Sequence, residues 1–330
     1  MTPADLSLTV LHAVRRAVDE GALIVDVPSS VKVERPRGGG VGDYASSVAL
    51  GLARPAGRSA LDVAAILEER LRDRPGIRAV DITGPGFLNF TLDGDSDGVV
   101  VRDVLAAGAR YGCSDALSSD RVRLLPALEP RAAVLTETVL RLLRSQGADA
   151  AISPGGERLA VLPASVDGTT VGARGDAGDL PDDVIRWAFL RPAAHDRVLP
   201  GAPLLVQHER NPLFRVRYAH ARARALLRNA AQLGFAPAYE ESVDAAGLLS
   251  LLGDHPAVLL SAARLRAPGR VARHLEAVAD ALLAFQHTVL PLGDEKPSAA
   301  HRSRLALAEA AGVVLAGGLS LLGISAPDQI

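Results

Sequence analysis

The chain has 330 residues, 48% of them hydrophobic and 22% charged, which is enough to bury a sizeable core and to divide into two or three domains. Its net charge of -2 excludes a protein coated in positive charge, so any surface for nucleic acid must be a local patch. A single cysteine, Cys113, excludes an internal disulfide and a cysteine-cluster metal site and is typical of a reducing cytoplasm.

Nothing in the sequence indicates a secreted or membrane protein. The first residues, M-T-P-A-D-L-S-L-T-V-L, lack the basic region and the small-residue cleavage site of a secretory signal. We see no apolar run of the ~18 residues that cross a bilayer. We therefore expect a cytoplasmic protein without a membrane partner.

The first third of the chain predicts a compact α+β domain. Apolar residues recur at helical spacing over Ala4 to Asp19 and again over Asp62 to Arg72. Between these helices, V-P-S-S-V-K-V-E-R-P alternates like a strand. Ile77 to Ile82 and Phe87 to Leu92 flank T-G-P-G and predict two strands joined by a tight loop. A helix from about Val99 to Arg110 leads out of the domain.

The glycines of this region are interpreted as turn residues. Gly38 to Gly42 lack the lysine and the strand-loop-helix context of a phosphate-binding loop. Asp43 is expected to cap the next helix rather than to catalyse a reaction. Gly84 to Gly86 are expected to shape the loop between the two strands.

The middle of the chain predicts a single βαβ unit. Val122 to Leu128 is typical of a buried strand, Ala132 to Ser145 of an amphipathic helix, and Arg158 to Pro163 of a second strand. The Gly/Asp-rich segment that follows is typical of a loop. One βαβ unit is too small to be a doubly wound domain.

The last part, from Pro181 to Ile330, predicts an all-α helix bundle. Apolar residues recur every three or four positions in five segments, and short Pro/Gly interruptions separate them. The segments are D-D-V-I-R-W-A-F-L, Asn211 to Leu233, Ala245 to Leu252, Val271 to Val289 and Arg304 to Leu322.

The segment Asn211 to Asn229 carries five arginines, and its pattern alone has two interpretations. As a helix it places its apolar residues on one side and its arginines on neighbouring faces. A solvated basic face explains this pattern. A surface for an anion explains it equally, because guanidinium groups match phosphate oxygens and aromatic rings such as Tyr218 stack on unpaired bases. Tyr218 can also be a half-buried packing residue.

Motifs for other chemistry are missing from the sequence. The eight histidines show neither H-x-x-x-H nor H-E-x-x-H spacing, and there is no G-x-S-x-G. Cys113, in Y-G-C-S, is interpreted as an ordinary buried thiol. We expect no metal and no cofactor.

Four segments resemble the arginyl-tRNA synthetase family. In the first domain they are V-E-R-P-R-G-G-G-V-G-D-Y-A-S-S-V-A-L and V-D-I-T-G-P-G-F-L-N-F-T-L, which resemble the family's N-terminal tRNA-binding domain. In the last domain N-P-L-F-R-V-R-Y-A-H-A-R-A-R-A-L-L and G-L-S-L-L-G-I-S-A-P-D-Q-I resemble the two ends of the helical anticodon-binding (DALR) domain. The resemblance covers about 1 to 112 and 181 to 330.

The resemblance fails in the middle of the chain. A class I synthetase holds ATP on a doubly wound sheet through an H-x-G-H motif and a K-M-S-K-S-type loop. At the expected place the sequence reads L-L-P-A-L-E-P-R-A-A-V-L-T-E-T, and no histidine occurs between His12 and His195. We therefore predict an N-terminal domain over 1-112, a degenerate catalytic remnant with a Rossmann-like βαβ unit over 113-180, and a DALR-type bundle over 181-330.

The resemblance implies the contacts for tRNA. On the anticodon-domain side they are Asn211, Arg215, Arg217, Tyr218, His220 and Arg222, with Tyr218 and His220 beside the bases. In the N-terminal domain they are Tyr44, Phe87 and Asn89, although a structural role explains Asn89 equally.

Three functions follow from this combination. The first is a non-catalytic synthetase paralogue that binds tRNA, resembling tRNA-Arg, through both outer domains. The second is an arginine-tRNA ligase that uses ATP, alone or with a protein partner that supplies catalytic groups. The third is a protein-interaction module whose bundle has lost RNA binding, which the near-neutral net charge favours. Arginine-dependent pyrophosphate exchange and tRNA binding separate the three.

Overall fold

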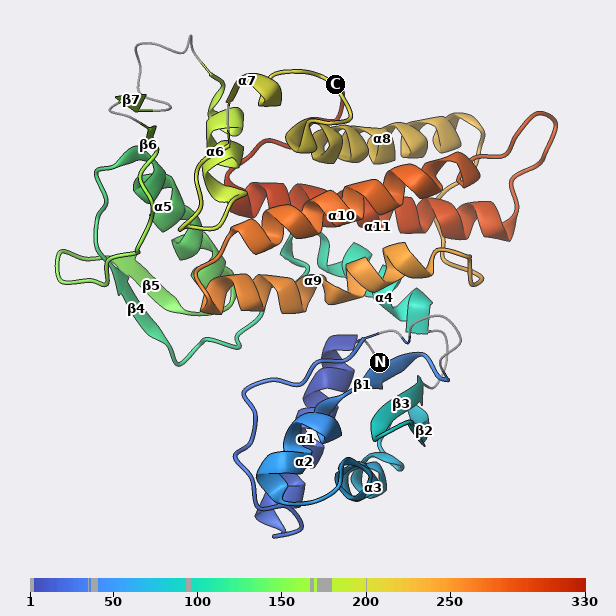
Figure 1. The fold of residues 1–330 in the computed structure, drawn as a ribbon. Helices are drawn as coiled ribbons and strands as arrows, with labels where there is room; N and C mark the ends of the chain where they lie inside the picture. The colour runs from blue at the N-terminus through green and yellow to red at the C-terminus, as the bar shows by residue number, and fades with distance from the viewer. Residues whose placement is uncertain are drawn as a thin grey trace. The chain divides into compact units, whose positions relative to one another are not determined.

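The computed structural model describes residues 3–34, 36, 41–92, 96–166, 169–170, 180–199 and 201–330 (Figure 1). The chain divides into two compact units, Met1–Val100 and Val101–Ile330. The middle segment of the chain belongs to the same unit as the C-terminal helices. The three-domain division with bounds at 112 and 180 stays a prediction.

The first unit places three helices against a three-stranded antiparallel sheet. The sheet order is β1-β3-β2, with Tyr44 opposite Phe90 and Ile82 opposite Leu88. The elements are α1 (Pro3–Asp19), β1 (Tyr44–Ser46), α2 (Val48–Ala56), α3 (Ala60–Leu71), β2 (Ile77–Thr83) and β3 (Phe87–Leu92). The predicted α+β domain is confirmed.

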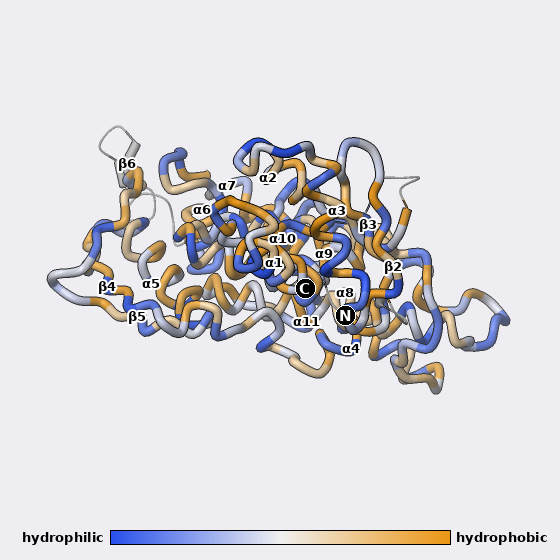
Figure 2. Tube along the Cα trace, turned by 90° about the horizontal axis from the view of Figure 1, so that it is seen from below, coloured by the Kyte–Doolittle hydropathy of each residue, from blue (hydrophilic) through white to orange (hydrophobic). Residues whose placement is uncertain are grey.

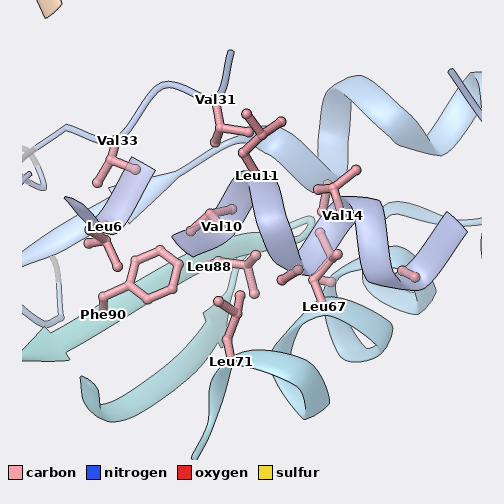
Figure 3. Packing of buried hydrophobic residues seen from close by; sticks show 14 of the residues in the cluster. Leu6, Val10, Leu11, Val14, Val31, Val33, Leu67, Leu71, Leu88 and Phe90 are labelled. Carbon is pink, nitrogen blue, oxygen red and sulfur yellow. The ribbon is translucent and has the colours of Figure 1, made fainter. Parts of the chain in front are cut away.

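The core of this unit forms where α1 and α3 meet the sheet. Val10 and Val14 of α1 face Leu67 and Leu71 of α3, and Leu88 closes the cluster from β3 (Figure 3). These apolar residues recur at helical spacing in the helices and alternate in the strand, so the periodicity of the sequence selects the buried face.

The turn between β2 and β3 requires glycine at position 86. Gly86 has φ 127°, and a Cβ at this position would lie 2.7 Å from the carbonyl oxygen of Ala60. Only glycine combines this backbone conformation with such a close approach. The predicted role of the G-P-G segment is confirmed.

Two expectations for this unit are wrong. Among its described residues, the stretch expected as a strand around Val31 and Val33 forms no strand but a single bridge, between Glu34 and Ala45. Its prolines cannot donate backbone hydrogen bonds to a sheet. Asp43 caps no helix. It precedes β1, and its Oδ2 accepts a hydrogen bond of 2.8 Å from the backbone N–H of Leu92, which fixes the end of β3. Gly38 to Gly40 lie outside the described residues.

The second unit combines a small βαβ unit with a helix bundle. Its N-terminal boundary falls within α4 (Ser96–Ala107), and η1 (Gly108–Arg110) follows. The βαβ unit consists of β4 (Arg121–Leu124), α5 (Pro130–Ser145) and β5 (Asp149–Ile152), and a small hairpin of β6 (Ser165–Val166) and β7 (Thr169–Thr170) comes next. The bundle contains α6 (Asp182–Leu190), α7 (Gly201–Leu204), α8 (Pro212–Gln232), α9 (Ala246–Arg264), α10 (Gly269–Phe285), η2 (Gln286–Thr288) and α11 (Ala299–Leu322).

The βαβ unit is confirmed, but its second strand lies elsewhere. β5 pairs in parallel with β4, with Arg121 opposite Asp149 and Leu124 opposite Ile152. The segment expected as that strand, Arg158 to Pro163, has no regular structure. Gly147, with φ 86°, turns the chain directly from α5 into β5. β4 also ends at Leu124 rather than Leu128, because Pro126 has no N–H to donate.

The bundle gathers around α11. Helices α8, α10 and α11 lie side by side, and α9 packs on α10 (Figure 1). Hydrophobic and hydrophilic residues alternate along most helices, as the tube of Figure 2 shows. The predicted all-α part is confirmed.

The prediction that no apolar segment is long enough to cross a bilayer is wrong for two helices. By length and composition, α9 and α11 suffice to cross a membrane, with mean hydropathies of 1.3 and 1.9. Their most apolar windows are 44% and 67% buried inside the protein. Helices of this kind are weak evidence of a membrane, because the core helix of a globular bundle passes the same test.

Candidate functional site

The N-terminus of α8 is fixed by Asn211. Its side-chain Oδ1 accepts a hydrogen bond of 3.2 Å from the N–H of Phe214, and its Nδ2 donates to the carbonyl oxygens of Leu204 and Val206 at 2.7 and 2.9 Å. Pro212 follows at the first helical position, where its missing N–H costs nothing. Asn211 is buried and its polar atoms are used within the chain, so it positions the helix rather than presenting a free amide.

Two arginines of α8 face α10. The Arg215 Nε lies 3.0 Å from Oδ1 of Asp280, and another guanidinium nitrogen donates to the carbonyl oxygen of Glu209 at 3.0 Å. Arg222 donates from Nε to Oε1 of Gln286 at 2.5 Å. These two guanidinium groups therefore brace α8 within the bundle.

The other basic residues of α8 meet α6 and the C-terminal segment. A guanidinium nitrogen of Arg217 lies 3.7 Å from Oδ2 of Asp183, which is a loose ion pair. The Nε of Arg224 lies 3.2 Å from Oδ1 of Asp328. The buried ring of His220 has its Nδ1 3.0 Å from the carbonyl oxygen of Pro327. Among these residues Arg217 has the weakest internal partner.

An aromatic pair stands on the outer side of α8. The rings of Phe214 and Tyr218 are one helical turn apart, with centroids separated by 5.6 Å and planes inclined by 17°. Tyr218 is 39% exposed. A flat ring stacked on a second ring and open to solvent on one side is a platform on which an unpaired base can stack.

A cleft of about 300 Å³ opens beside this pair. Its wall is polar and apolar in about equal parts, and Arg217 carries the one charged side chain among the described residues that line it. The lining residues come from α6, the loop before α8, the first turns of α8 and the C-terminal segment: Pro181, Val184, Leu204, Leu205, Val206, Gln207, Asn211, Leu213, Phe214, Arg217, Pro327, Gln329 and Ile330. A cleft that combines apolar side chains, amide groups and one guanidinium fits a planar base next to a phosphate.

The cleft thus brings together some of the expected residues and adds others. Asn211 and Arg217 line it, and Tyr218 stands beside it through its stack with Phe214. Arg215 and Arg222 lie toward α10 instead. Sequence reasoning missed Phe214, although its position four residues before Tyr218 indicates a ring pair on a helix. It also missed Ile330, whose place beside α8 depends on the tertiary fold.

The three expected residues of the first unit have different environments. Tyr44 is buried in β1. Asn89 is also buried, and its Nδ2 donates a hydrogen bond of 2.7 Å to Oγ1 of Thr83. Phe87 is 38% exposed at the start of β3. Because Leu88 and Phe90 point into the core, Phe87 and Asn89 belong to the opposite face of the sheet.

The N-terminus of α5 is occupied by the chain itself. The Glu129 carboxylate accepts hydrogen bonds from the backbone N–H groups of Ala132 at 2.7 Å and Ala164 at 2.9 Å. A helix N-terminus after a parallel strand is where a doubly wound fold holds phosphate. Here a side-chain carboxylate already fills that position.

Arg131, the second residue of α5, links this helix to neighbouring segments of the chain. Its fully buried guanidinium donates to four carbonyl oxygens, those of Phe189, Leu162, Asp196 and Ala193, at 2.7 to 3.3 Å. Burial lowers the pKa of Arg131, and the nearby carboxylates of Glu129 and Asp196 oppose that shift. The adjoining cleft of about 420 Å³ is lined mainly by apolar residues. This arrangement joins α5 to the segments around it.

The remaining chemical groups form no reactive centre. Within the described ranges, no three His, Cys, Asp or Glu side chains lie where they could share a metal ion. Cys113 is exposed rather than buried, since it lies in the turn after η1 where its N–H bonds to the carbonyl oxygen of Arg110. Its partial desolvation raises the pKa of the thiol, and the nearby Arg110 opposes this. A raised pKa disfavours the nucleophilic thiolate.

Two family models match the chain, one at each end. Residues 8–92 match the arginyl tRNA synthetase N terminal domain. Residues 216–330 match the DALR anticodon binding domain. The second match contains most of α8 and all of α9, α10 and α11.

Curated relatives agree with these matches. The arginine–tRNA ligase of Frankia alni is 28% identical over an alignment of 553 residues that covers 100% of both chains. That of Micrococcus luteus is 38% identical over 200 residues, which are 55% of this chain and 36% of the relative. Since this chain has 330 residues, at least 223 positions of the longer alignment, the difference between 553 and 330, are gaps in it.

Solved structures share the fold. The arginyl-tRNA synthetase of Thermus thermophilus superposes with a TM-score of 0.71 at 13% identity, covering 100% of both chains. That of Plasmodium falciparum gives a TM-score of 0.62 at 7% identity, covering 99% of both. The fold is therefore that of a tRNA synthetase with an α+β N-terminal domain and a helical anticodon-type domain. The chain belongs to the arginyl-tRNA synthetase family.

Proposed function

We propose that this protein binds tRNA, specifically one resembling tRNA-Arg, without charging it. The observation that carries the proposal is a contrast within the second unit. The cleft beside α8 offers an aromatic stack and a loosely paired arginine, whereas the N-terminus of α5 is filled by Glu129. The first arrangement suits RNA and the second leaves no free helix N-terminus for phosphate.

Two residues of α8 are proposed to contact the RNA directly. Tyr218 stacks on an unpaired base, an interaction worth about 1–3 kcal/mol for each base. Arg217 exchanges its 3.7 Å contact with Asp183, a loose ion pair between two half-buried side chains, for a charge-assisted hydrogen bond to a phosphate oxygen. The apolar side chains of the cleft receive the base.

The other expected residues are proposed to position these two. Asn211 fixes the first turn of α8 and His220 lies against the C-terminal segment. Arg215 and Arg222 hold α8 against α10. Substituting them is expected to weaken RNA binding through the shape of the bundle.

The first unit is proposed to supply a second, weaker contact. Phe87 offers an exposed ring for stacking, while Tyr44 and Asn89 hold the strands that present it. Two weak sites on one chain raise the overall affinity without any new contact. This is a physical reason for a chain to retain both outer domains.

Three observations support the absence of catalysis. The chain has no H-x-G-H at the end of β4 and no K-M-S-K-S-type loop. Its alignment with the Frankia alni ligase contains at least 223 gap positions, the difference between 553 and 330, and the parallel sheet of the described residues has two strands. A doubly wound core that holds ATP and an amino acid needs several βα units. We propose that the segment 113–180 is a structural remnant of that core, and that the protein acts in the cytoplasm.

A tRNA titration of the full chain and its site variants tests this function. Fluorescence anisotropy with labelled tRNA should show an affinity that Tyr218→Ala lowers about tenfold and Arg217→Gln lowers by a smaller factor. The control is Tyr111→Phe, which changes a half-buried ring stacked on His255 of α9 and should bind like the wild type. Equal affinities for Tyr218→Ala and the wild type would remove the proposed stacking site.

One observation favours a second candidate function. The arginines of α8 are paired with partners of the same chain, namely Asp280, Asp183, Gln286 and Asp328. A face on which three arginines, Arg215, Arg217 and Arg224, already face carboxylates suits a protein partner as well as RNA. The combined change of Arg215, Arg217 and Arg222 to Glu should abolish tRNA binding if RNA is the partner.

A further inference from the structure

A second basic cleft lies in the first unit, away from the residues discussed so far. It has a volume of about 480 Å³ and is lined by Thr9, His12, Arg15, Arg16, Arg74 and Pro75. Four lining residues come from α1, and the other two come from the turn that joins α3 to β2. Three guanidinium groups and one imidazole surround the cleft, and none of the described residues that line it carries a carboxylate.

The core of the unit holds these groups in place. α1 buries Val10 and Val14 against α3 (Figure 3), so the residues on its other side face solvent. Thr9, His12 and Arg16 recur there at spacings of three and four residues, which places them on one stripe. In the turn after α3, the N–H of Arg74 bonds to the carbonyl oxygen of Leu71 at 3.1 Å. The cleft is therefore built on rigid elements.

The positive charges of the cleft are largely unpaired. Arg15 makes no side-chain hydrogen bond or ion pair with any part of the chain that the structure describes. The side chain of Arg74 donates one hydrogen bond within the described residues, from Nε to the carbonyl oxygen of Arg70 at 3.3 Å. Arg16 lies 3.6 Å from Glu20, but Arg70 holds that carboxylate at 2.6 Å and lowers its pKa.

A neighbouring cleft makes the contrast clear. It shares Arg16 and Arg74 but also contains Glu20, Glu69 and Asp73, so three carboxylates balance its three arginines. The side of α1 that carries His12 and Arg15 has no such acidic partner in its lining. Of these two clefts, the one lined by His12 and Arg15 therefore carries the unbalanced positive charge.

We propose that this cleft binds phosphate groups. Guanidinium forks match phosphate oxygens with paired hydrogen bonds, and a concave site raises the local potential that attracts an anion. The expected source is the backbone of the same RNA, an assignment that rests on the proposed function. Phe87 belongs to the sheet face that points away from the helices, so the cleft and Phe87 lie on opposite layers of the unit. The cleft is therefore a phosphate site separate from the stacking site.

The salt dependence of tRNA binding tests the proposal. Each phosphate contact steepens the plot of log K against log salt by about 0.7 to 0.9. The full chain carrying Arg15→Gln and Arg74→Gln should bind tRNA about tenfold more weakly at low salt and show a slope shallower by about 1.5. The matched control carries Arg54→Gln and Arg58→Gln, two exposed arginines of the same unit outside the cleft, and should keep the wild-type slope. Thermal melting should give the same midpoint for both variants, because none of the four arginines is buried.

Three outcomes have distinct meanings. If the wild type binds tRNA and all slopes agree, the cleft is not a phosphate site, while the proposed function stands. If the wild type binds no tRNA, the proposed function fails, and a calorimetric titration with inorganic tripolyphosphate decides about the cleft. Binding of tripolyphosphate that the Arg15 and Arg74 changes abolish supports a free phosphate compound as the source. Equal titrations of the wild type and the variant overturn the proposal.

Discussion

Two buried histidines of the bundle lack the partners that a charged ring needs. His255 on α9 and His274 on α10 stack with their centroids 5.2 Å apart, and Tyr111 stacks on His255 at 5.9 Å. Burial lowers the pKa of His255 to about 3, with the neighbouring His274 adding to the shift, and burial lowers the pKa of His274 to about 4. Both rings are therefore neutral in the folded protein at neutral pH.

These histidines make stability depend on pH. A lowered pKa means that only the unfolded chain takes up protons between about pH 6.5 and the folded values. The free energy of unfolding should be constant above pH 6.5 and fall below it, by up to about 1.4 kcal/mol per pH unit for each histidine. Urea unfolding from pH 7.5 to 4.5 measures this slope.

The variant His274→Phe should remove about half of that slope. His195→Gln, which changes an exposed ring, should leave it as in the wild type. Identical slopes for His274→Phe and the wild type would mean that the buried pair does not control the acid sensitivity.

The buried guanidinium of Arg131 predicts a large loss of stability on removal. Arg131→Met leaves carbonyl oxygens of four residues without their donor, and each unsatisfied buried group costs about 1–3 kcal/mol. Since the site relaxes in part, we expect the free energy of unfolding to fall by about 3 kcal/mol, as measured by denaturation with guanidinium chloride. Arg158→Met changes an exposed arginine of the same region and should cost less than about 0.5 kcal/mol. A loss equally small for Arg131→Met would contradict a stabilising role for its four hydrogen bonds.

At the scale of elements, α11 meets its neighbours through glycines. A Cβ at Gly318 would lie 2.5 Å from Cδ2 of Leu275 on α10, whereas one at Gly317 would meet only an atom at 3.5 Å. Gly317→Ala should stabilise the protein by up to about 1 kcal/mol through helix propensity. Gly318→Ala should lose that gain and destabilise the bundle by a comparable amount, because the added methyl group forces Leu275 to move. Equal effects of the two changes in thermal unfolding would contradict the close packing of α10 on α11.

Periodicity explains which elements could be predicted. The long helices, such as α1, α8, α10 and α11, carry apolar residues at three- and four-residue spacing, so a local pattern predicts them. The four-residue helix α7 carries no such pattern and is not predicted. β5, Asp149–Ile152, has four residues and only one large apolar side chain, and its strand conformation depends on pairing with β4. A capping aspartate accepts a hydrogen bond from a helix start two or three residues further on, which is why the sequence predicts Asp43 as a cap. Its actual partner, Leu92, lies 49 residues away.

The same distinction holds for the candidate site. The motif around Tyr218 locates the segment, and helical spacing separates its buried and exposed faces. The partners of its arginines, such as Asp280 and Asp328, come from elements that meet α8 only in the folded bundle. The closing of the α5 N-terminus by Glu129 depends likewise on Ala164, 35 residues away.

At the scale of the molecule, the absence of catalysis is a separate prediction. The purified full chain with ATP, arginine and labelled pyrophosphate should give no arginine-dependent exchange above the blank, with or without tRNA, because the N-terminus of α5 carries its own carboxylate. A family ligase in the same assay is the positive control. Exchange by this chain would establish the ligase alternative.

The central claim is that the two outer parts of the chain still recognise tRNA. The most direct measurement compares the dissociation constants of the full chain for a tRNA-Arg transcript and for a random RNA of equal length at one fixed low salt concentration. The proposed function predicts tighter binding of the tRNA by at least about tenfold, because stacking and shape add to the electrostatic attraction that both RNAs share. Equal dissociation constants, or no binding of either RNA, would contradict it.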